Sequence, residues 1–295
     1  MKQLGVKLGA LVLGLSMLQG WPAAAVPAFP GAQGYGAVAK GGRGGKVVKV
    51  SNLNDGGAGS LRACVAASGP RTCVFTVGGT IILASPITVQ EPYLTIAGQT
   101  APGGGIQLRR TGAAEGAPLY LYNTHDIVVR YLRSRPGTGT DTDAISIDNS
   151  QKVILDHVSL YWASDENLGA SGELVEDVTI QNSILAEGLW PHSKGFLGCN
   201  GDGTVCRRIT SYRNLYALNR DRNPNIDMTD SVFEMYENVA YGAYSEYAEI
   251  FDSAGGSLVN IVNNYFKNAS FGNTTCAIVY HPETGPATAR IYAAG

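Results

Sequence analysis

The sequence predicts an all-β protein, a right-handed parallel β-helix that forms a solenoid in a single domain. After Cys73 the chain consists of apolar runs of about four to nine residues, rich in Val, Ile, Thr and Tyr and broken by turns, which is the pattern of strands. These runs return at an interval near 25 residues, which is typical of a solenoid. Between them the sequence lacks the periodicity of crossover helices, so an ordinary α/β sheet is not expected.

Five segments define the interval when their apolar positions are aligned. Successive segments are offset by 26, 25 and 31 residues, and the last follows after 50 residues, which we interpret as two repeats. A rung of this length holds about three short strands. Few Asn-Gly or Asp-Gly turns separate the runs, which argues against a sandwich of hairpins. The segments begin at Arg130, Asp156, Gln181, Tyr212 and Val262.

Asparagines fall at, or one position away from, the same place in several repeats. We expect Asn182, Asn214 and Asn264 to stack as a ladder in the interior or at a corner of the solenoid. This role would be structural rather than catalytic.

The N-terminus has the features of a secretory signal peptide. Lys2 and Lys7 form a basic region, Leu8 to Leu18 an apolar region, and Ala23 to Ala25 a cleavage site of small residues. We therefore expect residues 1–25 to be removed and residues 26–295 to form the secreted domain, extracellular or periplasmic. An N-terminal anchor helix is the less favoured alternative, because the apolar region is short.

The length and composition are ample for one large core or two small ones. The 295 residues are 44% apolar and 16% charged with a net charge of −2, which is too balanced for a nucleic-acid-binding surface. No apolar run is long enough for a mature transmembrane span. We expect a monomer without nucleic-acid or membrane partners.

The cysteines fit an oxidising compartment. Cys64–Cys73 and Cys199–Cys206 would each close a short loop, although four cysteines allow three connectivities. Cys276 stands outside both pairs and is expected to be buried. Neither pair has C-x-x-C spacing, so a zinc site is not favoured.

The first part of the mature chain is rich in glycine. Residues 29–45 read FPGAQGYGAVAKGGRGG, and Val47 stands where a phosphate-binding loop requires Ser or Thr, so glycine turns explain the segment better. A strand is expected over Lys46 to Val50. A short helix is expected over Ser60 to Ala67 with Ser60 as its N-cap.

A group of acidic residues is the first candidate site. Asp141 and Asp143 precede one predicted strand, and Asp165 and Glu166 follow the next. Equivalent positions on neighbouring rungs lie about 4.8 Å apart, so these carboxylates could bind a hard cation such as Ca²⁺. The alternative is a set of loop acids without a metal.

Cations follow the acidic group along the repeat. Lys194 and Arg222 are expected one and two rungs beyond it on the same side. A face with carboxylates at one end and cations at the other would suit an anionic polymer of uronic acids. Trp190 and His192 could contact the sugars of this polymer. The alternatives are that the tryptophan only packs against the protein and that the histidine is only solvated, and neither alternative is less expected than sugar contact.

Several motifs together resemble the bacterial pectate lyases of polysaccharide lyase family 1, and the resemblance covers nearly the whole mature chain. It implies a parallel β-helix, dependence on Ca²⁺ and cleavage of polygalacturonate by β-elimination, so the expected partner is polygalacturonate or pectin. The motifs, in the family's order, are FPGA-x-GYG (29–36), GGRGGKV (41–47), SNLND (51–55), GSLR (59–62), IAGQTAPG (96–103), DAISI (143–147), VILDH (153–157) and RNP (222–224).

The resemblance also implies roles for individual residues. Asp143, with Asp141 as its companion, and Asp165 match calcium ligands, Lys194 matches a substrate-binding lysine, and Arg222 matches the catalytic base. Arginine is an unusual base because its pKa lies above about 12.

The sequence departs from the family pattern at three places. Gly169 replaces a carboxylate four residues after the second calcium ligand, for which Glu166 could compensate, or calcium could bind mainly with substrate. Asp227 stands where a second arginine often follows the base. The sequence ends at Gly295 within an expected strand, so a shortened member or a truncated product lacking C-terminal rungs is an open possibility.

Three alternatives to a calcium-dependent pectate lyase remain. One is a lyase for another uronide such as alginate, and another is a lyase for methylated pectin, against which Asp143 and Asp165 argue. The third is a β-helix that binds polysaccharide without cleaving it. A hydrolase on the same fold is less favoured, because no paired catalytic carboxylates occur with a clear Gly-His-Gly partner.

Overall fold

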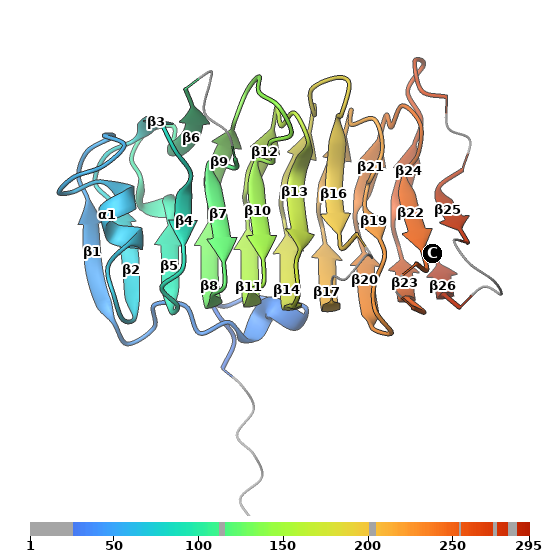
Figure 1. Ribbon diagram of the computed structural model, residues 1–295, viewed down its shortest axis with the longest axis horizontal. Coiled ribbons are helices and arrows are strands. Elements are labelled where there is room, and N and C mark those ends of the chain that lie inside the picture. Colours follow the sequence, from blue (N-terminus) through green and yellow to red (C-terminus); the bar gives the residue numbers. More distant parts are fainter. Residues whose placement is uncertain (1–25, 112–115, 201–204, 254, 274–275, 283–287) are drawn as a thin grey trace, which may run out of the picture.

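The chain winds into a solenoid whose three parallel sheets run along its full length (Figure 1). The computed structural model describes residues 26–111, 116–200, 205–253, 255–273, 276–282 and 288–295. The predicted signal peptide, residues 1–25, lies outside the described residues. The parallel β-helix expected from the repeat is confirmed.

From β2 to β25 each rung contributes one strand to each sheet, in the order A, B, C, whereas β1 and β26 belong to sheet A alone. Sheet A contains β1 (Lys46–Val50), β2 (Arg71–Phe75), β5 (Leu94–Ala97), β8 (His125–Arg130), β11 (Gln151–Asp156), β14 (Val175–Gln181), β17 (Cys206–Tyr212), β20 (Val232–Tyr236), β23 (Leu258–Val262) and β26 (Arg290–Ala294).

The two other sheets are built in the same way from shorter strands. Sheet B contains β3 (Gly79–Leu83), β6 (Ile106–Arg110), β9 (Leu132–Arg135), β12 (Ser159–Tyr161), β15 (Ile184–Ala186), β18 (Leu215–Ala217), β21 (Val239–Tyr241) and β24 (Tyr265–Lys267). Sheet C contains β4 (Ile87–Val89), β7 (Leu119–Tyr122), β10 (Ile145–Asp148), β13 (Glu166–Ser171), β16 (Lys194–Gly198), β19 (Asn225–Ile226), β22 (Ala248–Phe251) and β25 (Ile278–His281).

The strand register reproduces the alignment of the repeats. Asp156 pairs with Arg130 on one side and with Gln181 on the other, and Gln181 pairs with Tyr212. The 50-residue interval does contain two repeats, because Tyr236 pairs with both Tyr212 and Val262.

Inward-facing apolar side chains stack from rung to rung and form the core. On sheet A the row runs through Ile127, Val153, Val178, Ile209 and Phe233, all of them fully buried. Burial of a side chain of this size stabilises the fold by about 1.5–3 kcal/mol.

An asparagine ladder lies at the corner between sheets A and B. The backbone N–H of Asn214 donates to Asn238 Oδ1 (2.8 Å), and that of Asn238 donates to Asn264 Oδ1 (2.9 Å). Asn182 lies one residue outside the ladder and donates instead to Asp156, so Ser183 takes the ladder position on its rung. The expected ladder exists, with Asn238 as the member that the sequence alignment missed.

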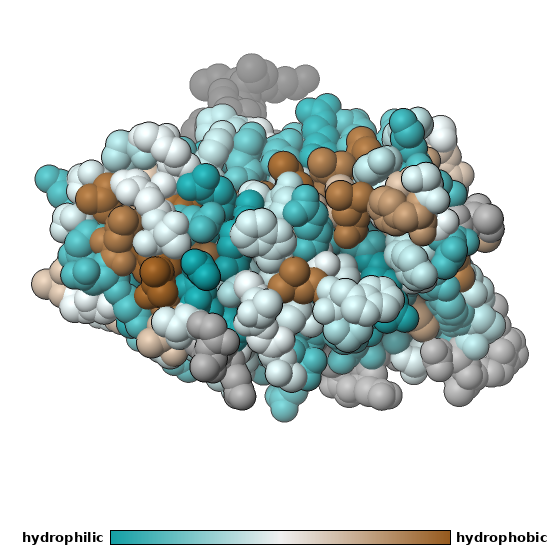
Figure 2. Space-filling view, turned by 90° about the horizontal axis from the view of Figure 1, so that it is seen from above, coloured by the Kyte–Doolittle hydropathy of each residue, from teal (hydrophilic) through white to brown (hydrophobic). Residues whose placement is uncertain are grey.

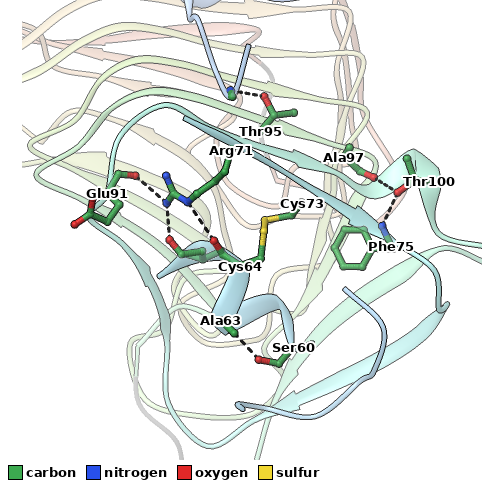
Figure 3. The surroundings of a disulfide bond; sticks show 12 residues. Ser60, Ala63, Cys64, Arg71, Cys73, Phe75, Glu91, Thr95, Ala97 and Thr100 are labelled. Carbon is green, nitrogen blue, oxygen red and sulfur yellow. Dashed lines mark hydrogen bonds between the residues drawn. A yellow bond between two sulfur atoms is a disulfide. The ribbon is translucent and has the colours of Figure 1, made fainter. Parts of the chain in front are cut away.

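A short helix and a disulfide stabilise the N-terminal end of the solenoid (Figure 3). Ser60 is the N-cap of helix α1 (Leu61–Val65). Its hydroxyl accepts a hydrogen bond from the N–H of Ala63 (3.1 Å), as expected from the sequence. The disulfide joins Cys64 in this helix to Cys73 in β2. Buried Arg71 donates to main-chain carbonyls, including that of Cys64 (3.1 Å), so its charge is satisfied by the backbone.

The glycine-rich segment crosses the outer face of sheet A (Figure 1). It includes the 3-10 helix η1 (Tyr35–Val38), and a second 3-10 helix, η2 (Gly98–Thr100), follows β5. Gly36 donates to Thr179 on β14 (2.9 Å), whereas Gly42 donates to Thr95 on β5 (2.9 Å). A Cβ at Gly42 would collide with the backbone of Arg71, so close approach to the sheet, and not only turn formation, requires glycine here.

The second disulfide, Cys199–Cys206, is also present, in a connection between sheets C and A. The expectation for Cys276 was wrong, because this residue is exposed. It lies in the connection between β24 and β25, outside the strands that face the core. Among the described residues no helix has the length and apolar character needed to cross a membrane.

Candidate active site

The acidic residues gather where the loops from sheet B enter sheet C. Asp143 lies two residues before β10, and Asp165 directly precedes β13, which begins at Glu166. Carboxylate oxygens of Asp143, Asp165 and Glu166 lie within 4.8 Å of one another. Two neighbouring rungs therefore bring these three side chains together, as the repeat predicted.

Asp143 is held in place by neighbours on both rungs. The hydroxyl of Ser146 donates to Asp143 Oδ2 (2.7 Å), and the backbone N–H of Glu166 donates to Oδ1 (3.2 Å). Gly169 faces the same carboxylate from β13, and a Cβ there would collide with Asp143 Oδ2. Glycine thus provides the space that the Asp143 carboxylate occupies.

Crowding of the carboxylates disfavours their charged forms. Burial, together with the charge of Asp165, raises the pKa of Asp143 above its usual range. Burial and the charge of Asp143 raise the pKa of Glu166, although the nearby Arg222 opposes this shift. A divalent cation would relieve the repulsion, and the all-oxygen donor set suits calcium.

A second group of possible ligands shares Asp165 with the first. Asp141, Asp165 and His192 also place one ligand atom each within 4.8 Å of the others. His192 Nδ1 lies 2.5 Å from Asp165 Oδ1, so the histidine is close to a carboxylate and is not simply solvated. A nitrogen ligand fits calcium less well than the three carboxylates do.

The two cations lie on the next rungs, as the repeat predicted. Glu166 pairs in register with Lys194, and Lys194 forms a bridge with Asp221. The ammonium of Lys194 is 2.6 Å from Asp221 Oδ1 and is largely buried. Asp221 is a partner that sequence inspection missed, although it directly precedes Arg222.

Arg222 connects the cationic and acidic parts of the site. Its guanidinium Nη1 donates to Glu166 Oε1, and its backbone N–H donates to Glu249 Oε1 (2.7 Å). Burial raises the pKa of Glu249 to about 7. Glu249 lies in β22, one rung beyond Arg222, where it pairs in register with Asn225. Only extending the repeat by one more rung could have revealed it from the sequence.

A hollow of about 270 Å³ opens beside Arg222. Asp227, at the position of the family's second arginine, accepts a hydrogen bond from Ser253 there. Phe251 stacks on His281 with ring centroids 4.5 Å apart. The lining residues are Leu197, Asn200, Arg222, Asn225, Asp227, Phe251 and Ser253.

Trp190 lies in the same loop as His192 but makes its described contacts elsewhere. It is 68% exposed, packs edge-on against Tyr244 and lies 5.3 Å from the guanidinium of Arg220. On the face that carries these loops, hydrophobic side chains gather in separate patches between hydrophilic ones (Figure 2). The structure therefore does not bring Trp190 into the acidic cluster, though it leaves the indole accessible.

The sequence and the fold are both similar to those of pectate lyases. No family model matches the sequence. Probable pectate lyase C of Aspergillus fumigatus is 43% identical over 246 residues, which cover 82% of this chain and 54% of that protein. The chain thus spans about half the length of the curated relatives it matches.

Two solved structures share the fold at low sequence identity. The cedar pollen allergen jun a 1 has a TM-score of 0.67 at 16% identity, covering 89% of this chain and 80% of that chain. Pectate lyase Bsp165PelA from Bacillus sp. N165, in complex with trigalacturonate, has a TM-score of 0.59 at 19% identity, covering 90% and 86%. On its sequence similarity and its fold, the chain belongs to the pectate lyase family.

Proposed function

We propose that this protein is a secreted, calcium-dependent pectate lyase that cleaves α-1,4-linked polygalacturonate by β-elimination and releases unsaturated oligogalacturonides. The observation that carries the proposal is the placement of three carboxylates, Lys194 and Arg222 on consecutive rungs of one face.

Asp143, Asp165 and Glu166 would hold the calcium ion, with Asp141 as a companion at the loop. Their carboxylate oxygens suit a hard cation. Because the carboxylates repel one another, binding of a cation between them would be favourable. When bound, calcium would neutralise the substrate carboxylate and acidify the adjacent C–H. The glycine at position 169 leaves this site with fewer protein oxygens than the family pattern, which supports completion of the site by the substrate.

Arg222 would act as the base. It would take the proton from the carbon next to the substrate carboxylate, the C–H electron pair would form the double bond, and the glycosidic C–O bond at the β position would break. The leaving oxygen would then take a proton from the solvent and depart as a hydroxyl group. For this step Arg222 must release Glu166 and give its own proton to the solvent, because only the neutral guanidine can accept a proton. Neutralisation of Glu166 by calcium would favour both, since it removes the carboxylate that stabilises the guanidinium.

Lys194 would bind the substrate carboxylate, supported by its position between Glu166 and Asp221. His192 would contact sugar hydroxyls from the edge of the acidic cluster, and Trp190 would offer its exposed indole to a sugar ring further along. The protein would act as a monomer.

A non-catalytic polysaccharide-binding role is the second candidate. The ion pair between Arg222 and Glu166 favours it, because a guanidinium engaged with a carboxylate is a poor base. Gly169 and Asp227, which replace a family carboxylate and a family arginine, point the same way.

The first experiment follows ultraviolet absorbance of unsaturated product on polygalacturonate, with calcium and then with chelator. Growth of the signal only with calcium supports the lyase proposal, and Arg222→Ala serves as the inactive control. Absence of signal on polygalacturonate, alginate and methylated pectin, from a folded protein that pectin retains, would favour the binding role instead.

A further inference from the structure

The outer face of sheet B carries arginines that the proposed lyase reaction does not use. Strands β6 and β9 pair so that Gln107 lies beside Arg133 and Arg109 beside Arg135. Ile106 and Leu108 point into the core, and the alternation of a strand turns Gln107 and Arg109 outward. Neighbouring positions on paired strands are about 4.8 Å apart, so the side chains form a compact cationic group.

Two of these arginines lack a partner within the described chain. Arg109 is exposed, and neither Arg109 nor Arg133 takes part in a hydrogen bond or ion pair with any described residue; Arg133 Nε is buried without a hydrogen-bond acceptor. On sheet A, by contrast, Arg130 and Arg208 each pair with carboxylates, and the exposed Arg207 lies in register beside Glu176 rather than beside another arginine. Unneutralised guanidiniums in a protein of net charge −2 mark a place for an anion.

Aromatic rings continue the arginine group onto the next rung. The Arg135 guanidinium lies 4.2 Å from the centroid of the Tyr161 ring and donates to Ser159 Oγ (2.7 Å), which fixes its orientation. The adjacent Trp162 is 46% exposed, and its indole N–H donates to Glu187 (3.1 Å), which fixes the plane of the ring. Burial lowers the pKa of Arg135 to about 10, so an anion that displaced water here would also stabilise its charge.

Gln107, Arg109, Arg135 and Trp162 line a hollow of about 440 Å³. A neighbouring hollow of about 390 Å³ has Arg133 in its wall together with the glycines at 78, 79 and 103–105. Gly137 and Thr138 border the first hollow at the start of the loop that leads from β9 to β10, whereas Asp141 and Asp143 lie near the end of that loop. The hollow and the acidic cluster therefore have separate linings.

We propose that the two hollows, joined where Gln107 lies beside Arg133, form a second, non-catalytic binding site for an acidic saccharide, a segment of a uronate chain. A guanidinium binds a carboxylate through two parallel hydrogen bonds, which Arg109 and Arg133 are free to form. The exposed face of Trp162 suits the apolar face of a sugar ring, and Gln107 can bond to a hydroxyl. The choice of a uronate among acidic sugars rests on the proposed function, whereas the cationic and aromatic lining does not.

The experiment is affinity electrophoresis in gels containing polygalacturonate, with chelator to prevent cleavage. The test variant is Arg109→Glu, whose exposed side chain makes no described contact, so the fold should be retained. Its matched control is Arg207→Glu, the same charge change at an exposed position of sheet A. Relative to polymer-free gels, we expect the apparent Kd to rise about tenfold for Arg109→Glu only. Equal retardation of the two variants would overturn the proposal.

Two further measurements separate this site from a general attraction to polyanions and from the catalytic site. Trp162→Ala should weaken retardation by polygalacturonate but not by polyglutamate, and Trp162→Phe should restore it; equal loss in both gels would overturn the saccharide assignment. Turnover of trigalacturonate should be unchanged in Arg109→Glu, and a parallel loss would place Arg109 in the catalytic groove instead. If the protein shows no turnover at all, the proposed lyase function fails. Affinity electrophoresis then still tests the second binding site, because it does not depend on turnover.

Discussion

Arg222 and Glu166 form an ion pair although they are 56 residues apart in the sequence. The rung of Lys194 lies between their two rungs. All three residues lie where the chain enters sheet C, at or just before the first residue of a strand. The residue proposed as base is thus engaged by a residue proposed as calcium ligand. Binding of a cation at the carboxylates and freeing of the guanidinium are expected to be linked.

The first prediction concerns this arginine. Arg222→Lys should lower kcat on polygalacturonate by about 10²–10⁴-fold, the usual contribution of a positioned base, because the ammonium cannot reproduce the geometry of the guanidinium. KM should change little, since Lys194 still binds the substrate. Product absorbance at saturating calcium measures both constants.

Arg213→Lys is the matched control, because Arg213 forms an exposed ion pair with Glu237 on another part of the solenoid. It should leave the rate unchanged. A rate near that of the wild type in Arg222→Lys would remove Arg222 as the base.

The second prediction concerns calcium and stability. Asp143→Asn should raise the unfolding temperature in chelator, because it removes one of three crowded carboxylates, yet it should abolish the further rise that calcium gives the wild type. At a calcium concentration of about 100 times Kd, that rise corresponds to about 2.7 kcal/mol. Thermal melts with chelator and with calcium test both the higher unfolding temperature in chelator and the loss of the rise on calcium addition. An unchanged rise on calcium addition would exclude Asp143 as a ligand.

The third prediction concerns Gly169. Gly169→Ala should destabilise the protein by about 1–3 kcal/mol, because the added Cβ would push against the Asp143 carboxylate on the neighbouring rung. Urea unfolding in chelator measures the loss. Gly56→Ala is the control, since a Cβ at Gly56 meets nothing closer than 4.0 Å. Equal stability of the two variants would show that the carboxylate moves aside without cost.

The sequence predicted most of what the repeat determines. The interval alone gave the register of Asp156 and Gln181, the meeting of Asp143 with Asp165, and the order of Lys194 and Arg222, because a solenoid stacks equivalent positions directly above one another. No comparable rule governs which rotamer a long side chain adopts.

What escaped prediction therefore involves side chains and segments outside the repeat. The pairing of Arg222 with Glu166 is a choice among several nearby carboxylates, and burial of Glu249 depends on the rung that follows. The path of the glycine-rich segment across sheet A follows no period either, since threonine hydroxyls such as that of Thr179 hold its backbone. Cys276 is exposed in the connection between β24 and β25, a segment that the repeat does not describe.

The fourth prediction concerns the asparagine ladder. Asn238→Ala should cost about 2–4 kcal/mol, because the buried amide donates to Ser211 O (3.0 Å) and accepts from Asn214 N–H, and both partners would lose their bond. Asn260→Ala on the exposed face of β23 is the control and should change stability by less than about 0.5 kcal/mol. Urea unfolding of both variants checks this, and a loss for Asn238→Ala no larger than that of the control would show that the ladder adds no stability.

The last prediction concerns the pH dependence of stability through Glu249. Its pKa is about 7 in the folded protein, because of burial, against an ordinary value of 4.5. The folded state therefore binds this proton more tightly than the unfolded state does, and the contribution of Glu249 to the free energy of unfolding must fall as pH rises from 4.5 to 7. One such proton gives a slope of about 1.4 kcal/mol per pH unit across this window.

Glu249→Gln should remove this contribution while keeping an acceptor for the N–H of Arg222. Its stability relative to the wild type should therefore increase steadily between pH 4.5 and 7 and stay constant above. Asp143 and Glu166 titrate in both proteins and cancel in the difference, provided that chelator is present. Urea unfolding at half-unit pH steps measures this difference in stability between the variant and the wild type. Glu173→Gln, which removes an exposed carboxylate, is the control. A difference that does not vary with pH would show that Glu249 is ionised in the folded protein at pH 5, held by charges that outweigh its burial.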